Sequence, residues 1–478
     1  MKNQLKPFFI LLTIAFSTFS FANIKLFPTA NATYVEGPIT RDTVWTLVDS
    51  PFVLSKDVIV YPNATLTIEP GVEVRFGEAF SLIVSGRLYA NGTDKTITFT
   101  SNKEQPETGD WNAIKFNGTE KSTLIGCFIS YAEYGIFVEN GDVEIENSAI
   151  SLSQNGITVA NGKLRIQNSI VKICYQNGIN TTNSECTVQN SAIAENQENG
   201  IRITGSGQVT IQKNTIMANG NGVLLTGNET SNVNISQNKI SANKQSGIRI
   251  DADNHTDILI SNNTVSSNDI GFYILSPTST YMTNNSISYN NIGILYADGF
   301  HTANYNDVYG NDMGMDVLSK ATVNAEHNYW GDPSGPYHES LNPNGMGNQV
   351  GGDGVNLDFI FFLTKPIGFI NTRPRADLLT DKVLVPRNEN VMFLATNSSD
   401  DGRIVGYFFD FGDGNNSGWT TLSIFTHKYS ASLNYLASLR VMDDNGTVSN
   451  VVTTTIYVDE TLPSLYASLE LGDFIVHE

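Results

Sequence analysis

Residues 155–160 read NGITVA, and the phrase returns as NGINTT at 177–182, NGIRIT at 199–204 and NGVLLT at 221–226. Its constant feature is a glycine followed by an apolar residue. Nine such glycines occur at steps of 21 to 25 residues: Gly135, Gly156, Gly178, Gly200, Gly222, Gly247, Gly271, Gly293 and Gly314. An asparagine recurs with a similar period: Asn147, Asn168, Asn190, Asn214, Asn238, Asn262, Asn284, Asn306 and Asn328. Two markers with one period predict a solenoid of stacked coils, each about 22 residues long.

The apolar residues within each coil alternate as they do in β-strands. In Val143-Glu144-Ile145 and Ile157-Thr158-Val159, every second side chain is apolar, so one face is buried and the other is wet. The strands are too short for a helical coil. Parallel stacking at about 4.8 Å satisfies the backbone of each strand through the coils on either side. We therefore predict an all-β parallel solenoid.

Both repeated markers are interpreted as architecture. The asparagines are predicted to line up in a turn, where their amides hydrogen-bond along the stack as a ladder. The glycines are predicted to take φ > 0 before each strand.

The first residues predict export. Lys2 and Lys6 precede an apolar run at 8–16, and Ser20-Phe21-Ala22 follows, which is typical of a signal peptide at residues 1–22. The run is short for a membrane anchor, and no later run approaches membrane length. Residues 23–44 are expected to be a polar lead-in, with strands from Trp45. The mature chain is thus expected to be secreted, extracellular or on the cell surface, without a transmembrane segment.

The net charge limits the possible partners, and the cysteines and Asn-x-Ser/Thr triplets raise questions of covalent modification. A formal charge of −20 makes nucleic acid and anionic membranes poor partners, whereas cations and neutral glycans suit the chain better. Cys174 and Cys186 could pair, or they could be buried thiols. Asn-x-Ser/Thr triplets such as Asn63 and Asn117 are possible glycan acceptors in an exported protein.

Phrases at both ends of the repeat carry a family resemblance. Ile68-Glu69-Pro70-Gly71-Val72 and Gly109-Asp110-Trp111 resemble the first coils, and residues 328–336 (NYWGDPSGP) the last coil, of right-handed parallel β-helix proteins. This is the carbohydrate-binding and sugar-hydrolase (CASH, PbH1) repeat family, which includes periplasmic copper-maturation proteins. The resemblance implies a right-handed, single-stranded parallel β-helix over residues 45–362. It implies no single activity, because this fold hosts lyases, hydrolases, epimerases, adhesins and scaffolds.

The exit phrase is interpreted as an end cap near residues 328–360. Asn328 falls on the asparagine series, so it is predicted to be the last rung of the ladder. Tyr329 and Trp330 are predicted to cover the open end of the core, which would otherwise expose strand edges. Its aromatic residues could alternatively grip a sugar.

The candidate binding site is a stripe of outward residues, two positions after each repeat glycine. It comprises Phe137, Thr158, Asn180, Arg202, Leu224, Arg249, Tyr273, Leu295 and Asp316. The glycan-groove candidates are Asn180, Arg202, Arg249, Asp251 and Tyr273. Evenly spaced guanidinium, aromatic and amide groups suit an extended saccharide. The alternative is an ordinary solvated sheet face.

Catalysis remains the second hypothesis, as a polysaccharide lyase or glycoside hydrolase acting along the same groove. Asp251, Asp253 and Asp257 are close in sequence, but the last two fall in a polar turn. The stripe lacks a convincing acidic pair, so no catalytic residue is assigned. No cofactor is expected, and calcium is kept as the alternative. Copper delivery is disfavoured because His255, His301 and His327 are scattered.

The period disappears after residue 362. A linker at 363–373 leads to the phrases Tyr407-Phe408-Phe409-Asp410-Phe411-Gly412-Asp413-Gly414 and His427-Lys428-Tyr429. Residues 374–458 thus resemble a polycystic-kidney-disease (PKD) domain, an immunoglobulin-like β-sandwich. Where the family usually has a glycine, this chain has Ser432-Leu433-Asn434. Asp400, Asp401 and Asp410 are weak calcium candidates, and residues 459–478 form an acidic tail.

The sequence therefore predicts an exported β-helix that binds carbohydrate or acts as an adhesive scaffold, with the PKD domain as spacer or interaction module. The expected partners are an extracellular polysaccharide or cell-surface glycan, and other surface proteins through the PKD domain.

Overall fold

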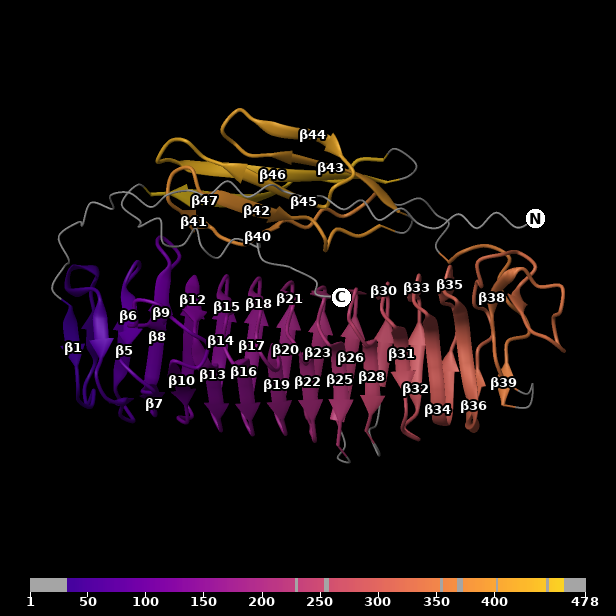
Figure 1. The fold of residues 1–478 in the computed structure, drawn as a ribbon, viewed down its shortest axis with the longest axis horizontal. Coiled ribbons are helices and arrows are strands. Elements are labelled where there is room, and N and C mark those ends of the chain that lie inside the picture. The colour runs from indigo at the N-terminus through magenta and orange to yellow at the C-terminus, as the bar shows by residue number, and fades with distance from the viewer. Residues whose placement is uncertain are drawn as a thin grey trace.

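A computed structural model describes residues 32–227, 231–252, 258–352, 356–367, 373–400, 403–443 and 447–459. A long right-handed parallel β-solenoid runs from β1 (Thr33–Val35) to β39 (Leu357–Asp358), and a β-sandwich lies beside it (Figure 1). The predicted fold class is confirmed. Because β1 pairs in parallel with β3 (Phe52–Leu54), the solenoid begins inside the expected lead-in. The predicted signal peptide and residues 460–478 of the tail lie outside the described residues.

Each regular coil contributes three strands, and the coils stack in parallel. The first strands are β13 (Ala132–Glu139), β16 (Asn155–Ala160), β19 (Ile179–Thr182), β22 (Asn199–Thr204), β25 (Asn221–Thr226), β28 (Ser246–Asp251), β31 (Ile270–Ile274), β34 (Ile292–Ala303) and β36 (Met313–Asn324). The second strands are β14 (Asp142–Glu146), β17 (Lys163–Gln167), β20 (Glu185–Gln189), β23 (Gly207–Gln212), β26 (Ser231–Ser236), β29 (Ile258–Ser261) and β32 (Thr280–Thr283). The long β34 and β36 cover both positions in the last coils.

The third strands form a separate 13-stranded sheet. After β1 and β3 they are β6 (Glu73–Phe76), β9 (Ile97–Ser101), β12 (Cys127–Ser130), β15 (Ala149–Ser151), β18 (Ile170–Lys172), β21 (Ala192–Ala194), β24 (Thr215–Met217), β27 (Lys239–Ser241), β30 (Thr264–Ser266), β33 (Ser286–Ser288) and β35 (Asp307–Tyr309). The remaining strands of the early coils are β2 (Thr43–Trp45), β4 (Val58–Val60), β5 (Thr65–Ile68), β7 (Ser81–Val84), β8 (Arg87–Asn91), β10 (Trp111–Phe116) and β11 (Lys121–Ile125), with a short 3-10 helix at Leu47–Asp49.

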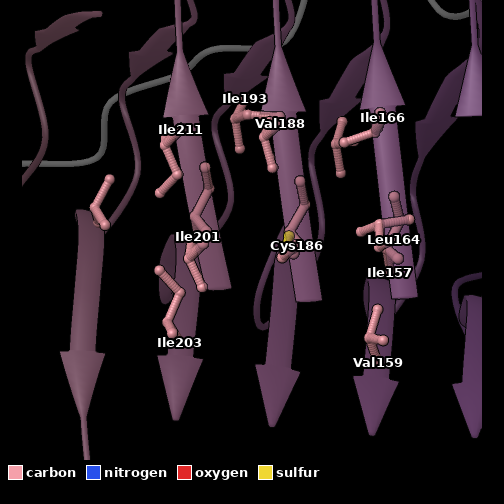
Figure 2. Packing of buried hydrophobic residues seen from close by; sticks show 14 of the residues in the cluster. Ile157, Val159, Leu164, Ile166, Cys186, Val188, Ile193, Ile201, Ile203 and Ile211 are labelled. Carbon is pink, nitrogen blue, oxygen red and sulfur yellow. The ribbon is translucent and has the colours of Figure 1, made fainter. Parts of the chain in front are cut away.

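Alternating apolar side chains fill the interior of the coils. Figure 2 shows Ile157 and Val159 of β16 packed with Leu164 and Ile166 of β17, and the neighbouring coils repeat the arrangement. These side chains are almost wholly buried. Stacked coils thus share one continuous core, in which each coil covers the next.

The predicted asparagine ladder exists, but the predicted series mixes two turn positions. Asn147, Asn168, Asn190, Asn262 and Asn284 occupy left-handed turn positions with φ between 47° and 57°. The ladder is formed by the following residue of each coil. Its members are Asn214, Asn238, Asn263, Asn285, Asn306 and Asn328. Each of the first five donates from Nδ2 to the Oδ1 of the next member at 2.9–3.1 Å. Serines hold this position in earlier coils, at Ser148, Ser169 and Ser191.

A second ladder, which was not predicted, runs along the turn between the third and first strands. Its members are Asn196, Asn219, Asn243, Asn268, Asn290, Asn311 and Asn348, again joined from Nδ2 to Oδ1 at 2.9–3.1 Å. Each Oδ1 also accepts the backbone N–H of the preceding member. The buried amides are therefore satisfied along the stack rather than by water.

The predicted positive φ of the repeat glycines is wrong. All nine lie in the described part of the chain, and none has φ in the left-handed region. A Cβ on Gly222 would lie 2.5 Å from the carbonyl oxygen of Gly247 and 3.0 Å from Nδ2 of Asn243. The glycine is required because the neighbouring coil and the second ladder leave no room for a side chain.

The end of the solenoid agrees with the predicted last rung. Asn328 Oδ1 accepts from Asn306 Nδ2 at 3.1 Å, while its own Nδ2 donates to the carbonyls of Ala303 and Ala325. Trp330 is wholly buried against the core with Val350. Short strands β37 (Pro336–Tyr337) and β38 (Gly347–Gln349) belong to this end.

The three cysteines are buried and unpaired in the described structure, so the buried-thiol alternative is confirmed. Burial raises the pKa of the Cys174 and Cys186 thiols to about 12. These thiols are therefore protonated packing groups at neutral pH.

The C-terminal domain is a two-sheet sandwich. One sheet contains β40 (Leu379–Thr380), β42 (Asn390–Leu394) and β45 (Ile424–Lys428); the other contains β41 (Leu384–Val385), β47 (Val452–Val458), β46 (Asn434–Asp443), β43 (Ile404–Asp410) and β44 (Asn416–Thr420). Phe393, Phe409 and Tyr429 are buried between the sheets. The sandwich lies against the 13-stranded sheet (Figure 1), where Thr215 Oγ1 and Thr396 Oγ1 are 3.2 Å apart and Lys95 Nζ is 3.6 Å from Asp459 Oδ2.

Candidate functional site

The structure places the predicted outward stripe in one continuous column. Its members are direct Cα partners from coil to coil, in the order Phe137, Thr158, Asn180, Arg202, Leu224, Arg249, Tyr273, Leu295 and Asp316. All are partly exposed. Because parallel strands are about 4.8 Å apart, Arg202 and Arg249 are separated by roughly 10 Å along the solenoid.

Three of the candidate residues contact one another. Arg249 Nη2 lies 3.1 Å from Asp251 Oδ2 on the same strand, and the Arg249 guanidinium carbon lies 5.3 Å from the ring centre of Tyr273 on the next coil. The Arg249 and Asp251 side chains are 31% and 50% exposed, which leaves both within reach of a ligand. The ion pair and the ring hold the guanidinium at a fixed place on the face.

Arg202 differs from Arg249 in its partners. Its Cα partners are Asn180 and Leu224, and neither neighbour supplies a carboxylate. Within the described residues its Nε is buried without a hydrogen-bond acceptor, and no ion pair forms at its guanidinium. The buried Nε cannot be reached by an incoming group, so any contact with a ligand would use the terminal nitrogens of this partly exposed side chain.

Hydrogen-bonded polar columns flank the stripe on both sides. On one side Asn199 Nδ2 donates to Asn177 Oδ1 at 2.8 Å, and Asn221 Nδ2 donates to Asn199 Oδ1 at 3.0 Å. On the other side the hydroxyls of Thr204 and Thr226 are 3.0 Å apart. The amide column is buried beneath the face, whereas the partly exposed hydroxyls of Thr204 and Thr226 lie on the face beside Arg202 and Leu224.

Asp251 and Asp316, two described acidic residues of this face, are too far apart for the carboxyl pair of an inverting glycosidase. Asp316 lies three coils beyond the coil of Asp251, which corresponds to roughly 14 Å. The two carboxyl groups of inverting glycosidases are about 6.5–9.5 Å apart. Asp253, Asp257 and His255 lie outside the described residues.

The described histidines of the solenoid lie apart from one another. In the described ranges no group of three or more His, Cys, Asp or Glu side chains could hold a metal ion. His301 is buried between Thr280 and the carbonyl of Asp298, and this burial lowers its pKa. His327 instead stacks on Tyr305, with ring centres 5.1 Å apart.

In the C-terminal domain, Asp410 Oδ1 accepts the backbone N–H of Gly412 at 3.0 Å, as in a turn. Asp400 is described, whereas Asp401 lies outside the described residues. The calcium set of Asp400, Asp401 and Asp410 therefore stays a prediction. Among the residues described, no helix is long and apolar enough to span a membrane.

Three protein families match parts of the chain. The right-handed β-helix region matches residues 112–258, the periplasmic copper-binding protein family (NosD) matches residues 250–348, and the PKD domain family matches residues 371–458. No curated protein matches the sequence.

Solved structures resemble this chain over different shares of its length. The C-terminal part is 37% identical to a chain from a study of the promiscuous specificity of β-sandwich carbohydrate-binding modules, covering 19% of this chain and 36% of that one, with a TM-score of 0.18. It is 34% identical to the PKD1 domain of a Vibrio cholerae metalloprotease, covering 18% of this chain and 99% of that one, with a TM-score of 0.16. A periplasmic alginate epimerase is 15% identical over 60% of this chain and 84% of its own, and its TM-score of 0.52 shows a shared fold.

Proposed function

Because this chain is a right-handed parallel β-helix protein with a C-terminal PKD domain, we propose that it is an exported protein that binds an extended polysaccharide along its outward stripe. The PKD domain is the spacer or interaction module of this protein. Its partner is an extracellular or cell-surface glycan.

The register of Arg202, Arg249 and Tyr273 carries this proposal. These side chains occupy one column at coils 1, 3 and 4 of a four-coil span. A polysaccharide is also a linear repeat, so a chain lying along the solenoid meets the same kinds of group at regular intervals. Guanidinium groups donate to carboxylate or hydroxyl oxygens, and Tyr273 offers an aromatic surface to the C–H face of a sugar.

The comparisons support a carbohydrate-related role at a general level. The alginate epimerase shares the solenoid fold, and the first sandwich relative comes from a study of carbohydrate-binding modules. A match to a periplasmic family is in keeping with export. Since folds host many activities, the chemistry of the stripe has to be tested directly.

Binding by the mature chain, residues 23–478, to a panel of neutral and acidic polysaccharides tests the proposal. The variant Arg202→Ala, Arg249→Ala, Tyr273→Ala should lose at least tenfold in affinity. A matched control, Leu259→Ala with Tyr281→Ala, alters two outward, exposed side chains on second strands and should bind as the parent does. Equal binding by the triple variant and the parent would reject the stripe as the site.

The same samples test the catalytic alternative. New reducing ends would indicate a hydrolase, and unsaturated uronide absorbance would indicate a lyase. Turnover in the presence or absence of calcium would replace the binding proposal with an enzymatic one.

A further inference from the structure

A second candidate site lies between the two domains. A cavity of about 840 Å³ separates the 13-stranded sheet of the solenoid from the PKD domain. Strands β9, β12, β15 and β18 of this sheet, with their adjoining turns, form one wall. The other wall consists of residues from the segments 373–384 and 450–454. Its size is within the range of small-ligand sites, which occur preferentially at domain interfaces.

The solenoid wall has an apolar centre. Phe128, Ala149 and Ile170 are outward Cα partners on successive coils and line the cavity. Asn147, Asn168 and Asn190 line it as well, one from each of three successive coils. An apolar strip beside evenly spaced amides can meet the two faces of a sugar, its C–H groups and its hydroxyls.

Basic side chains outnumber acidic ones around the cavity. Lys172, Arg373, Arg375 and Lys382 line it together with Asp377 and Asp381. Burial raises the pKa of both carboxyl groups. A chain with a formal charge of −20 thus has a cavity whose lining is net positive.

Two polar atoms in the cavity wall have no partner. The hydroxyl of Ser151, a residue only 1% exposed, and Oδ1 of Asn190 are both buried and make no hydrogen bond to the described residues. A buried polar group without a partner costs about 1–3 kcal/mol, so such groups are usually satisfied by a bound molecule or water. Both residues line the cavity.

We propose that the interdomain cavity binds a short saccharide that carries a carboxylate, such as a uronate oligomer. Its carboxylate pairs with Lys172 and Arg375, and its C–H face packs on Phe128 and Ile170. Its hydroxyls bind the side-chain amides of Asn147, Asn168 and Asn190. This site is separate from the outward stripe, which lies on first strands rather than on the 13-stranded sheet. The PKD domain is then half of a binding site rather than a spacer alone.

Calorimetric titration of the mature chain with trigalacturonate, cellotriose and citrate tests this proposal. Trigalacturonate should bind at one site per chain. Cellotriose and citrate should bind at least tenfold more weakly, because cellotriose lacks the carboxylate and citrate lacks the sugar ring. The double variant Lys172→Gln, Arg375→Gln should lower the affinity for trigalacturonate at least tenfold.

A filling variant provides an independent check that does not depend on charge. Ala149→Phe should block the cavity, whereas the matched control Thr264→Phe changes an exposed outward position of the same sheet beyond the cavity. Circular dichroism and melting curves establish that each variant is folded.

The outcomes separate this site from the stripe. Loss of trigalacturonate binding in Ala149→Phe, with retention in the stripe triple variant, supports the cavity. Loss in the stripe variant alone assigns the ligand to the stripe and overturns the cavity proposal. Equal affinity for all three probes, or no binding of trigalacturonate, also overturns it.

Discussion

The guanidinium carbon of Arg249 lies 5.3 Å from the ring centre of Tyr273, on directly adjacent coils of the solenoid. With a polysaccharide identified in the binding screen, Arg249→Ala and Tyr273→Ala should each lower the affinity about tenfold. Because each residue positions the other, the double variant should lose less than the product of the single effects. Isothermal titration of all four proteins measures this coupling, and strictly multiplicative losses would contradict it.

Replacing a repeat glycine should destabilise the solenoid although its φ suits any residue. In Gly222→Ala, the new methyl group would meet the carbonyl of Gly247 and the amide of Asn243. We expect a loss of about 1–3 kcal/mol in the free energy of unfolding, measured by denaturant titration. Gly37→Ala is the matched control, because a Cβ there meets nothing within 4 Å. An equally small effect in both variants would refute the packing explanation.

The second asparagine ladder should contribute strongly to stability. Asn219→Leu leaves the backbone N–H and the Nδ2 group of Asn196 without the acceptor that both use. A loss of about 2–4 kcal/mol is expected, since several buried polar groups lose partners together. Asn232→Leu, at an exposed position of β26, should change the unfolding free energy by less than about 0.5 kcal/mol. Chemical denaturation of both proteins gives the comparison.

Contact between the domains depends on small outward residues of the 13-stranded sheet. Thr215 is 2% exposed and contacts Thr396 of the PKD domain. Thr215→Arg should release the PKD domain and increase the radius of gyration in small-angle X-ray scattering. Thr264→Arg, two coils further along the same column, is exposed and should leave the radius unchanged. An unaltered radius in Thr215→Arg would show that this contact does not hold the domains together.

Asp307 should make the stability pH-dependent. Burial raises its pKa to about 6, although its Oδ1 accepts the backbone N–H of Ile367 at 2.9 Å. Its folded-state pKa exceeds the unfolded value, so its contribution is greatest below about pH 4 and is lost as the pH rises through 6. Asp307→Asn should therefore be more stable than the parent at pH 7, by at most about 3 kcal/mol, and the difference should vanish below pH 4. Melting curves across this range would contradict the assignment if the difference did not change with pH.

The period of the repeat was sufficient to predict the coil and the outward stripe. Once Gly200 and Gly222 define equivalent positions, Arg202 and Leu224 must face the same way, because side chains alternate along a strand. The same reasoning chose the wrong asparagine in some coils. Asn262 and Asn263 are adjacent, and Asn263, not the predicted Asn262, is on the ladder. The glycines were wrongly predicted to be needed for their backbone conformation. They are needed because a Cβ would collide with the neighbouring coil, and this contact cannot be read from the local sequence.

The interdomain contact was missed for a different reason. Third strands such as Ala149–Ser151 are only three residues long, so they give no extended alternation from which to assign an outward face. A signal was nevertheless present along the column. Outward positions change from Phe128, Ala149, Ile170 and Ala192 to Lys239, Thr264, Ser286 and Asp307, and the domain contact lies within the less polar part. The sequence alone could not show which sheet of the PKD domain packs against which sheet of the solenoid.

Both asparagine ladders have a direction. In each, the side-chain amide donates towards the C-terminal end and its carbonyl receives from the N-terminal end. The amide dipoles are therefore aligned in series along the axis, and every coil is completed by the coil synthesised after it. A growing chain would carry unsatisfied donors at its newest turn until Asn328 and Asn348 arrive. Premature termination within the repeat should thus leave a last coil with unpaired strand edges and ladder amides, a surface prone to association with other chains.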